Sequence, residues 1–192
     1  MNVLILNGSP RKHGNIARML SAIESEAVSL GGNVTALCIS DLQVKPCTGC
    51  MACRKKGSCV LPEDDAQLIL RRIQACDLLV IGSPCYWGNI PGQLKILFDR
   101  LVYGLMGESK SGFPLPLHKG KQAILVATCT TPFPFNLLFR QSRGTIRALR
   151  EIVKWSGFKV AGTLEVAGTR EKEVSQKELD KCRKMVRKYV GL

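Results

Sequence analysis

The sequence predicts a three-layer α/β fold, in which helices cover both faces of a doubly wound parallel sheet. Three observations carry this prediction. Short, almost continuous apolar runs recur along the chain, which is typical of strands buried on both faces of a parallel sheet. Longer segments between them repeat apolar residues every three or four positions, as amphipathic helices do. The two kinds of segment alternate from end to end, which is the order of α/β proteins.

The predicted elements fill the chain without a gap long enough for a linker. The strands are expected at residues 2–7, 33–39, 77–84, 121–129 and 158–168. The helices are expected at residues 15–30, 62–76, 91–102, 141–156 and 173–190. Residues 1–192 should therefore form a single domain, because no internal repeat or low-complexity segment divides them. Five strands favour the flavodoxin-like order 2-1-3-4-5 over the six-stranded dinucleotide-binding arrangement.

The first three strands and two helices follow from local signals. "NVLILN" is an apolar run closed by a glycine, and it predicts a buried strand. In the next segment Ile16, Met19 and Ile23 recur at helical spacing, and a pair of glycines ends the helix. "NVTALCI" is the second strand. The second helix begins with Pro62 and acidic residues, as a helix N-terminus should, and "DLLVIGSP" is the third strand.

The second half of the chain repeats these signals. The third helix starts with Pro91 and places Leu94 and Leu97 on one face. "KQAILVATC" is the fourth strand, and the helix after it ends before Gly157. In the fifth strand, "FKVAGTLEVAG", we expect Gly162 to mark a bulge. A basic amphipathic segment forms the last helix.

Composition indicates a cytoplasmic protein. Hydrophobic residues make up 45% of the chain and charged residues 22%, which is ordinary for a globular protein with one core. The first residues have a short apolar run followed by positive charge, the wrong order for a secretory signal. No apolar stretch approaches the roughly 20 residues that span a bilayer. We therefore expect no membrane partner.

The net charge of +13 raises the question of an anionic partner. The sequence has no zinc-finger spacing, no RNP-like aromatic motif and no recognition-helix pattern, so nucleic acid is not expected. A solvated helix face explains much of the charge. The alternative is an acidic protein, such as a small electron carrier, attracted by the positive field.

The loop after the first strand, "NGSPRKHGN", is suited to bind a phosphate. Loops at the carboxyl ends of such strands bind ligands, and this one leads into a helix N-terminus with unsatisfied N–H groups. Ser9, Arg11 and Asn15 offer polar groups, while Gly8 and Gly14 allow close approach. The pattern matches neither the dinucleotide fingerprint nor the P-loop. A plain turn in which Ser and Asn cap the helix is the alternative.

Three segments together resemble the NADPH-dependent FMN reductase and iron–sulfur flavoprotein group of flavodoxin-like proteins. They are "LNGSPRKHGN", "PCTGCMACRKKGSC" and "GSPCYWGNIPGQLKILFDR", and the match covers residues 1–105 best. The resemblance implies FMN as the ligand and homo-oligomeric assembly, as a homodimer or homotetramer. It implies that Ser9, Arg11 and Asn15 bind the phosphate of FMN and that Gly14 lets the phosphate approach the backbone.

The loop after the third strand should face the isoalloxazine ring. Tyr86 and Trp87 supply flat apolar surface, and Gly88 and Asn89 offer backbone donors. The alternative is that the two aromatic residues pack in the core. The resemblance assigns Pro84 and these four residues to the flavin ring.

The loop after the fourth strand, "TCTTPFPFN", should form a third wall of the flavin site. Thr128 and Thr130 offer hydroxyls, and Phe133 and Phe135 offer apolar cover. Iron–sulfur flavoproteins usually carry an Arg-Asn-Gly-Gly-like stretch here, so the electron donor and acceptor stay open. The apolar segment 132–139 is a candidate contact between subunits.

The segment from residue 45 to 62 concentrates cysteines in the pattern C-x2-C-x2-C-x5-C. Nine cysteines, an odd number in a reducing compartment, argue against a disulfide framework. The spacing is similar to the bacterial ferredoxin run and predicts a [4Fe-4S] cluster on Cys47, Cys50, Cys53 and Cys59. Zinc is the weaker reading, because its paired knuckles usually lie further apart. A cysteine-bearing loop without metal is the other alternative. Cys38, Cys76 and Cys129 sit at or next to apolar runs and are taken as small core residues, and Cys182 is expected to be incidental.

The resulting hypothesis is an FMN-dependent oxidoreductase that passes electrons through FMN and the cluster. No side chain is expected to act as a nucleophile or base, because the flavin carries the chemistry. NAD(P)H or an acidic electron carrier would be the donor. The alternatives are a cluster-free NAD(P)H-dependent FMN or quinone reductase, a non-enzymatic flavin-binding electron carrier, and a zinc-bearing regulatory protein that binds nucleic acid.

Overall fold

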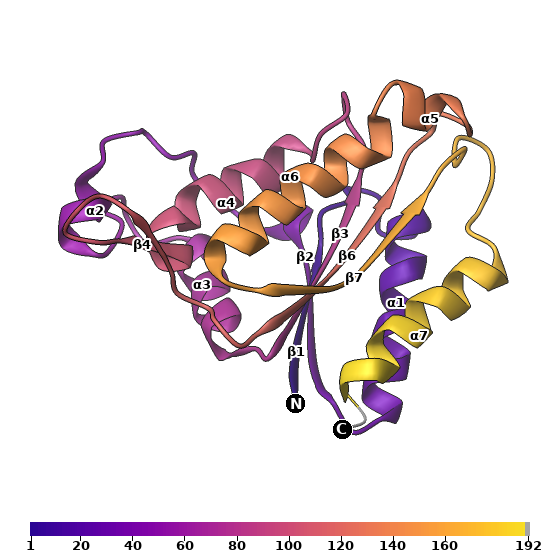
Figure 1. Ribbon diagram of the computed structural model, residues 1–192, viewed down its shortest axis with the longest axis horizontal. Coiled ribbons are helices and arrows are strands. Elements are labelled where there is room, and N and C mark those ends of the chain that lie inside the picture. The colour runs from indigo at the N-terminus through magenta and orange to yellow at the C-terminus, as the bar shows by residue number, and fades with distance from the viewer. Residues whose placement is uncertain (191–192) are drawn as a thin grey trace.

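The computed structural model describes residues 1–190 and contains one five-stranded parallel sheet between two layers of helices (Figure 1). The strands of this sheet are β1 (Asn2–Asn7), β2 (Asn33–Cys38), β3 (Leu78–Pro84), β6 (Gln122–Thr128) and β7 (Lys159–Val166). The longer helices are α1 (Asn15–Ser29), α3 (Asp65–Ala75), α4 (Gly92–Leu105), α6 (Gln141–Ser156) and α7 (Gln176–Val190). Their order β2-β1-β3-β6-β7 is the predicted 2-1-3-4-5, so the predicted fold is confirmed.

Alternate residues of each strand pack against opposite layers. Side chains such as Val3 and Ile5 face α1 and α7, which lie together on one side of the sheet in Figure 1. Side chains such as Leu4 and Leu6 face the layer formed by α3, α4 and α6. Burial on both faces explains why the strands appear in the sequence as continuous apolar runs rather than as alternating patterns.

The bulge predicted in the last strand is present. The pairing of β6 with β7 shifts register so that Ala123 lies opposite Val160 and Ile124 lies opposite Gly162. A Cβ at Gly162 would lie 2.8 Å from the sulfur of Met185 on α7. A larger residue at this position would displace the Met185 side chain where the bulged strand approaches that helix.

Several short elements lie outside the predicted set. They are the 3₁₀ turn η1 (Ile39–Asp41), α2 (Ala52–Lys56), the antiparallel pair β4 (Met106–Glu108) and β5 (Pro114–Pro116), and α5 (Phe135–Leu138). Elements of three to five residues are too short to show the apolar periodicity by which helices and strands are recognised in a sequence. They nevertheless matter, because α2 lies within the cysteine segment and the β4–β5 hairpin lines the cavity beside it.

The prediction for Cys182 is wrong. Its side chain is fully buried in the core between α7 and the sheet, where burial raises the pKa of the thiol to about 12. It is a small apolar core residue, like Cys76 on the other side of the sheet. None of the helices within residues 1–190 has both the length and the apolar character needed to cross a membrane.

Candidate functional site

The loops after β1, β3 and β6 meet at one edge of the sheet. These three strands are neighbours and parallel, so their carboxyl ends lie side by side. The order of strands reverses beside β1, which makes this edge the usual ligand position in doubly wound sheets. The segments predicted to bind the phosphate, to face the flavin ring and to offer hydroxyl groups therefore lie at the same edge of the sheet.

The first loop lies directly on its neighbours. The Gly8 N–H donates to the Gly82 carbonyl at 2.8 Å, and a Cβ on Gly8 would lie 2.7 Å from a methyl carbon of Leu94. The Ser9 side chain is nearly buried, and its hydroxyl accepts the main-chain N–H of Arg11 at 3.2 Å. The Arg11 side chain is exposed, and within residues 1–190 its guanidinium has no hydrogen bond or ion pair. It is available to an anion at the N-terminus of α1.

Asn15 has a structural contact that the sequence did not indicate. Its side-chain amide donates to the Lys172 carbonyl at 2.9 Å, and its carbonyl oxygen accepts the Val174 N–H at 2.9 Å. The side chain thus ties the start of α1 to the loop before α7. Gly14, just before the helix, leaves the first-turn N–H groups of α1 without intrahelical partners, as at any helix start. These groups can meet a phosphate while the Asn15 side chain stays in place.

The third-strand loop is a tight two-residue turn after Pro84. Tyr86 and Asn89 exchange both main-chain hydrogen bonds at 2.9 Å, and Trp87 and Gly88 have φ values of 55° and 70°. Two successive positive φ angles define a type I′ turn. The Trp87 side chain is fully exposed and Tyr86 is 46% exposed, so neither packs in the core. Both are free to contact a planar ligand.

The start of α6 supports this turn, which the sequence analysis missed. A Cβ on Gly144 would lie 2.0 Å from the Gly88 carbonyl oxygen, so only glycine allows the helix and turn to meet. The Thr145 hydroxyl donates to the Asn89 carbonyl at 3.1 Å. A glycine inside an otherwise regular amphipathic helix was the available signal.

The fourth-strand loop completes the edge. Thr128 is nearly buried opposite Pro84, and its carbonyl accepts the Cys85 N–H at 2.8 Å. Thr130 is exposed one step beyond the strand. Large apolar side chains then project to solvent around α5, namely Phe133, Phe135, Leu138 and Phe139.

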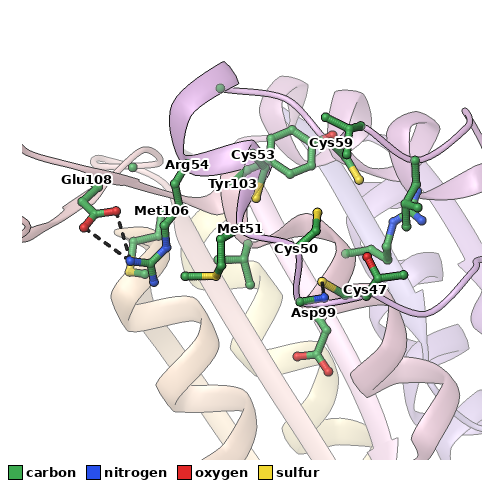
Figure 2. Close-up of a pocket in the computed structure, with 18 of the residues that line it drawn as sticks. Cys47, Cys50, Met51, Cys53, Arg54, Cys59, Asp99, Tyr103, Met106 and Glu108 are labelled. Carbon is green, nitrogen blue, oxygen red and sulfur yellow. Dashed lines mark hydrogen bonds and ion pairs between the residues drawn. The ribbon is translucent and has the colours of Figure 1, made fainter.

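The four clustered cysteines line a separate cavity of about 510 Å³. Figure 2 shows Cys47, Cys50, Cys53 and Cys59 on one side of it, facing residues of α4 and the β4–β5 hairpin such as Tyr103. Left-handed residues turn the loop sharply between the cysteines, at Gly49, Met51 and Gly57. The cavity lies beside the C-terminal half of α4, whereas the turn at residues 86–89 precedes the N-terminus of that helix.

A buried arginine fixes the base of the cysteine loop. The Arg100 side chain has no exposed surface, and it forms an ion pair with Asp64 at 3.2 Å. Its guanidinium also donates to the Lys45 carbonyl at 3.3 Å, while its Nε has no hydrogen-bond partner. A permanent positive charge therefore forms part of the cavity wall, as do Arg54 and its ion-pair partner Glu108 (Figure 2).

Local groups already act on the cysteines. The main-chain N–H of Ala52, and secondarily the Thr48 hydroxyl, lower the pKa of the Cys50 thiol. Burial, and secondarily the neighbouring Cys59, raise the pKa of Tyr103. The donor set of four thiols on one short loop suits a thiolate-ligated cluster.

Within residues 1–190 no three metal-ligating side chains are already gathered around one point. Holding a cluster would require the loop to draw its sulfurs together. A Cβ added at Gly49 or Gly57 would meet no atom within 4 Å, so the backbone between the cysteines is not packed against neighbours at these points.

The fold and the edge formed by the three loops define a flavodoxin-like protein with a ligand site at its topological switch point. The chain belongs to the NADPH-dependent FMN reductase family, whose model matches residues 1–169.

Two sequence relatives and one solved structure show what the chain is similar to. The chain is 38% identical over 102 residues to an iron-sulfur flavoprotein of Methanosarcina thermophila, an alignment that covers 53% of each chain. It is 27% identical to an iron-sulfur flavoprotein of Clostridioides difficile, over 99% of this chain and 78% of the relative. The alignments with the first relatives thus span about half of their length. A solved NAD(P)H:quinone oxidoreductase from Methanothermobacter marburgensis has a TM-score of 0.73 at 18% identity, covering 97% of this chain and 98% of that one.

Proposed function

We propose that the protein is an FMN-dependent oxidoreductase that also carries a [4Fe-4S] cluster and exchanges electrons with NAD(P)H or an acidic electron carrier. The observation that carries the proposal is the lining of one cavity by all four cysteines of the C-x2-C-x2-C-x5-C motif, in a member of the FMN reductase family. The names of the relatives from Methanosarcina and Clostridioides support the cluster.

The residues at the carboxyl edge would position the flavin. Ser9, Arg11 and the N–H groups from Gly14 into α1 would hold the phosphate, where the helix dipole and the guanidinium favour an anion. The turn formed by Tyr86 and Asn89 would lie along the ring. Bound FMN would supply the redox chemistry, so the protein needs no nucleophile.

Two further groups would complete the ring site. Trp87 and Gly88 lie in the turn that follows Pro84, and Thr128 pairs with Pro84 at the end of the neighbouring strand, with Thr130 two residues beyond it. Their hydroxyls and amides would orient the ring by hydrogen bonds. These assignments are proposals that FMN-contact mapping of the loaded protein would test.

The charge around the cysteine loop favours an anionic cluster. No acidic residue occurs between Leu42 and Pro62, while four cations do: Lys45, Arg54, Lys55 and Lys56. Arg54 and Arg100 are paired with Glu108 and Asp64, so within the described residues the unpaired positive charge near the cysteines comes from Lys45, Lys55 and Lys56. A cluster with four thiolates is net negative, and such surroundings stabilise it and raise its potential.

Metal analysis of anaerobically prepared protein tests the cluster. About four iron and four sulfide per chain are expected after reconstitution, with FMN bound. Cys50→Ser should lower the iron content and leave FMN in place, because the two sites use different segments. Cys85→Ser, outside the motif, is the matched control. Fewer than about one iron per chain would favour the cluster-free reductase, and stoichiometric zinc would favour a structural zinc site.

Reduction experiments separate the remaining alternatives. Bleaching of the flavin absorbance by NADPH or NADH under anaerobic conditions would support direct use of a nicotinamide donor. Protein that holds FMN but catalyses no oxidation of NADPH or NADH by a quinone would be a non-enzymatic flavin-binding electron carrier. Protein without FMN that binds nucleic acid would refute the proposal.

Assembly is proposed to bury the exposed apolar residues near α5. Phe133 is 74% exposed, Leu138 72% and Phe139 59%, a density of apolar surface that is costly to leave in water. Because these residues adjoin the carboxyl edge, a homodimer or homotetramer would wall the flavin with a second subunit. Light scattering at micromolar concentration should give a mass above 21.1 kDa, the mass of one chain. A monomer would contradict this proposal.

A further inference from the structure

One exposed face of α6 carries a row of positive charge, with one acidic residue, Glu151, beside it. Successive cations lie three or four residues apart, which places them on the same side of a helix. All of them are exposed: Arg140 is the residue just before α6, and Arg143, Arg147, Arg150 and Lys154 lie within it. The four cations within the helix span about 17 Å at 1.5 Å per residue. In Figure 1 this helix crosses the front of the molecule from the side of α5 toward that of β4.

The charges of this row are not neutralised within the described residues. No hydrogen bond or ion pair involves any of the five side chains there, although cations on other helices are paired. On α7, for example, Arg187 pairs with Glu26 and Arg183 with Asp180. The one acidic residue of α6, Glu151, accepts the Trp155 indole N–H at 2.6 Å.

Such an arrangement is unfavourable for an isolated helix. Like charges three or four residues apart destabilise a helix by a few tenths of a kcal/mol per pair. Glu151, four residues after Arg147 and three before Lys154, offsets only part of this repulsion, because it forms no ion pair with the row within residues 1–190. The row would be stabilised by a negatively charged surface from outside the chain.

The row begins at the candidate flavin site. Gly144 contacts the Gly88 carbonyl, and the Thr145 hydroxyl binds Asn89, so the first turn of α6 supports the flavin-facing turn. The fully exposed Trp87 projects from that same turn. Arg140 and Arg143 therefore lie next to the redox edge. A molecule that binds the row is placed where electrons would enter or leave.

We infer that this face of α6 is the docking surface for an acidic electron-carrier protein that exchanges electrons with the flavin. The inference rests on the proposed flavin function and adds the position of the partner. Complementary charge argues for an acidic partner, and the shared first turn of α6 argues for one that carries electrons. A nucleic acid would explain the positive charge but not its position beside the candidate flavin site. An acidic electron-carrier protein explains both observations.

The test reverses two charges in the middle of the row. Arg143→Glu with Arg147→Glu changes exposed residues that hold neither FMN nor the turn. Lys177→Glu with Lys181→Glu is the matched control, because these α7 residues have the same spacing, charge and exposure. The probe is a reduced, acidic plant-type ferredoxin mixed with the FMN-loaded protein in a stopped-flow instrument.

The rate constant for flavin reduction should fall about tenfold in the α6 variant at low ionic strength, because docking is electrostatically steered. At about 0.5 M salt, where screening acts within a few ångströms, the difference should largely vanish. The α7 variant should stay within about twofold of the wild type. Equal rates in the α6 and α7 variants at low salt would overturn the inference.

Two further results would also overturn it. Lys55→Glu with Lys56→Glu reverses charge at the cysteine loop, and slowing in that variant alone would place the carrier there. Loss of affinity for a labelled single-stranded oligonucleotide in the α6 variant, with an unchanged ferredoxin rate, would assign the row to nucleic acid. FMN content and photoreduction of each variant are measured in parallel. If the wild-type protein bound no FMN, that result would refute the proposed function and not the docking surface alone.

Discussion

Replacing Asp64 by alanine should destabilise the protein by about 4–6 kcal/mol. The Oδ1 atom of Asp64 caps α3 by accepting the Ala66 N–H at 2.9 Å, and such caps contribute about 1 kcal/mol. Its Oδ2 accepts the Lys45 N–H at 3.0 Å and forms the ion pair with Arg100. Removing one partner of a buried pair typically costs 3–5 kcal/mol, because the other charge is left uncompensated. Since domains of this kind have about 5–15 kcal/mol of stability, much of the margin would be lost.

The free energy of unfolding would be measured by guanidinium chloride titration at a fixed FMN concentration, because a bound ligand adds stability. Asp64→Asn keeps an oxygen for the cap but loses the charge, and should cost about 3–4 kcal/mol. Glu63→Ala is the control, since its pair with Arg71 is exposed on both sides and should contribute under about 1 kcal/mol. A loss below about 1 kcal/mol in Asp64→Ala would refute the view that Arg100 depends on this carboxylate.

Three other changes test the site and the core. Gly144→Ala should weaken FMN binding about tenfold or more with little change in helix content, because the new Cβ displaces the Gly88 carbonyl; unchanged affinity by fluorescence titration would contradict the assigned contact. Arg11→Ala should weaken FMN binding by about tenfold or more and leave riboflavin binding unchanged, since only FMN carries the phosphate. Burial lowers the pKa of His118 from its ordinary 6.5, so the unfolded chain binds a proton that the folded chain does not. Stability should therefore fall as the pH drops below about 6.5, and His118→Gln should flatten that dependence in urea titrations at pH 7 and pH 5.

The sheet and its main helices could be predicted because each has a strong local pattern. Strands buried on both faces are continuous apolar runs, and the helices keep one apolar face over three or more turns. The observed end of a helix differs from the predicted one where a capping side chain, which is not part of the periodic pattern, sets that end. The helix expected from residue 62 begins at Asp65, because Asp64 forms a capping box with Gln67.

The site was predictable as motifs but not as contacts. The turn containing Trp87 was identified from its composition, whereas its support by Gly144 depends on a helix more than fifty residues away. The same limit applies to Asn15, whose side chain binds Lys172 and Val174 near the other end of the chain. Hydrogen-bond partners so distant in sequence follow from the packing of the sheet, and a single sequence does not specify them.

Helix α4 connects the two candidate redox sites mechanically. Its N-terminus follows the turn at residues 86–89, while Arg100 and Tyr103 near its other end line the cysteine cavity. These residues lie about 12–17 Å along the axis from Gly92. The apolar face of α4 is buried in the same core as α3 and α6, with Leu94 and Leu97 fully inaccessible. Movement of Arg100 and Tyr103 relative to the turn at residues 86–89 would disrupt that packing, so a close-packed core fixes the α4 wall of the cysteine cavity, while the cysteine loop itself can adjust. A short-range process such as electron transfer benefits from a fixed separation, and the rigid helix provides it for the α4 wall of the cavity without a dedicated linking residue.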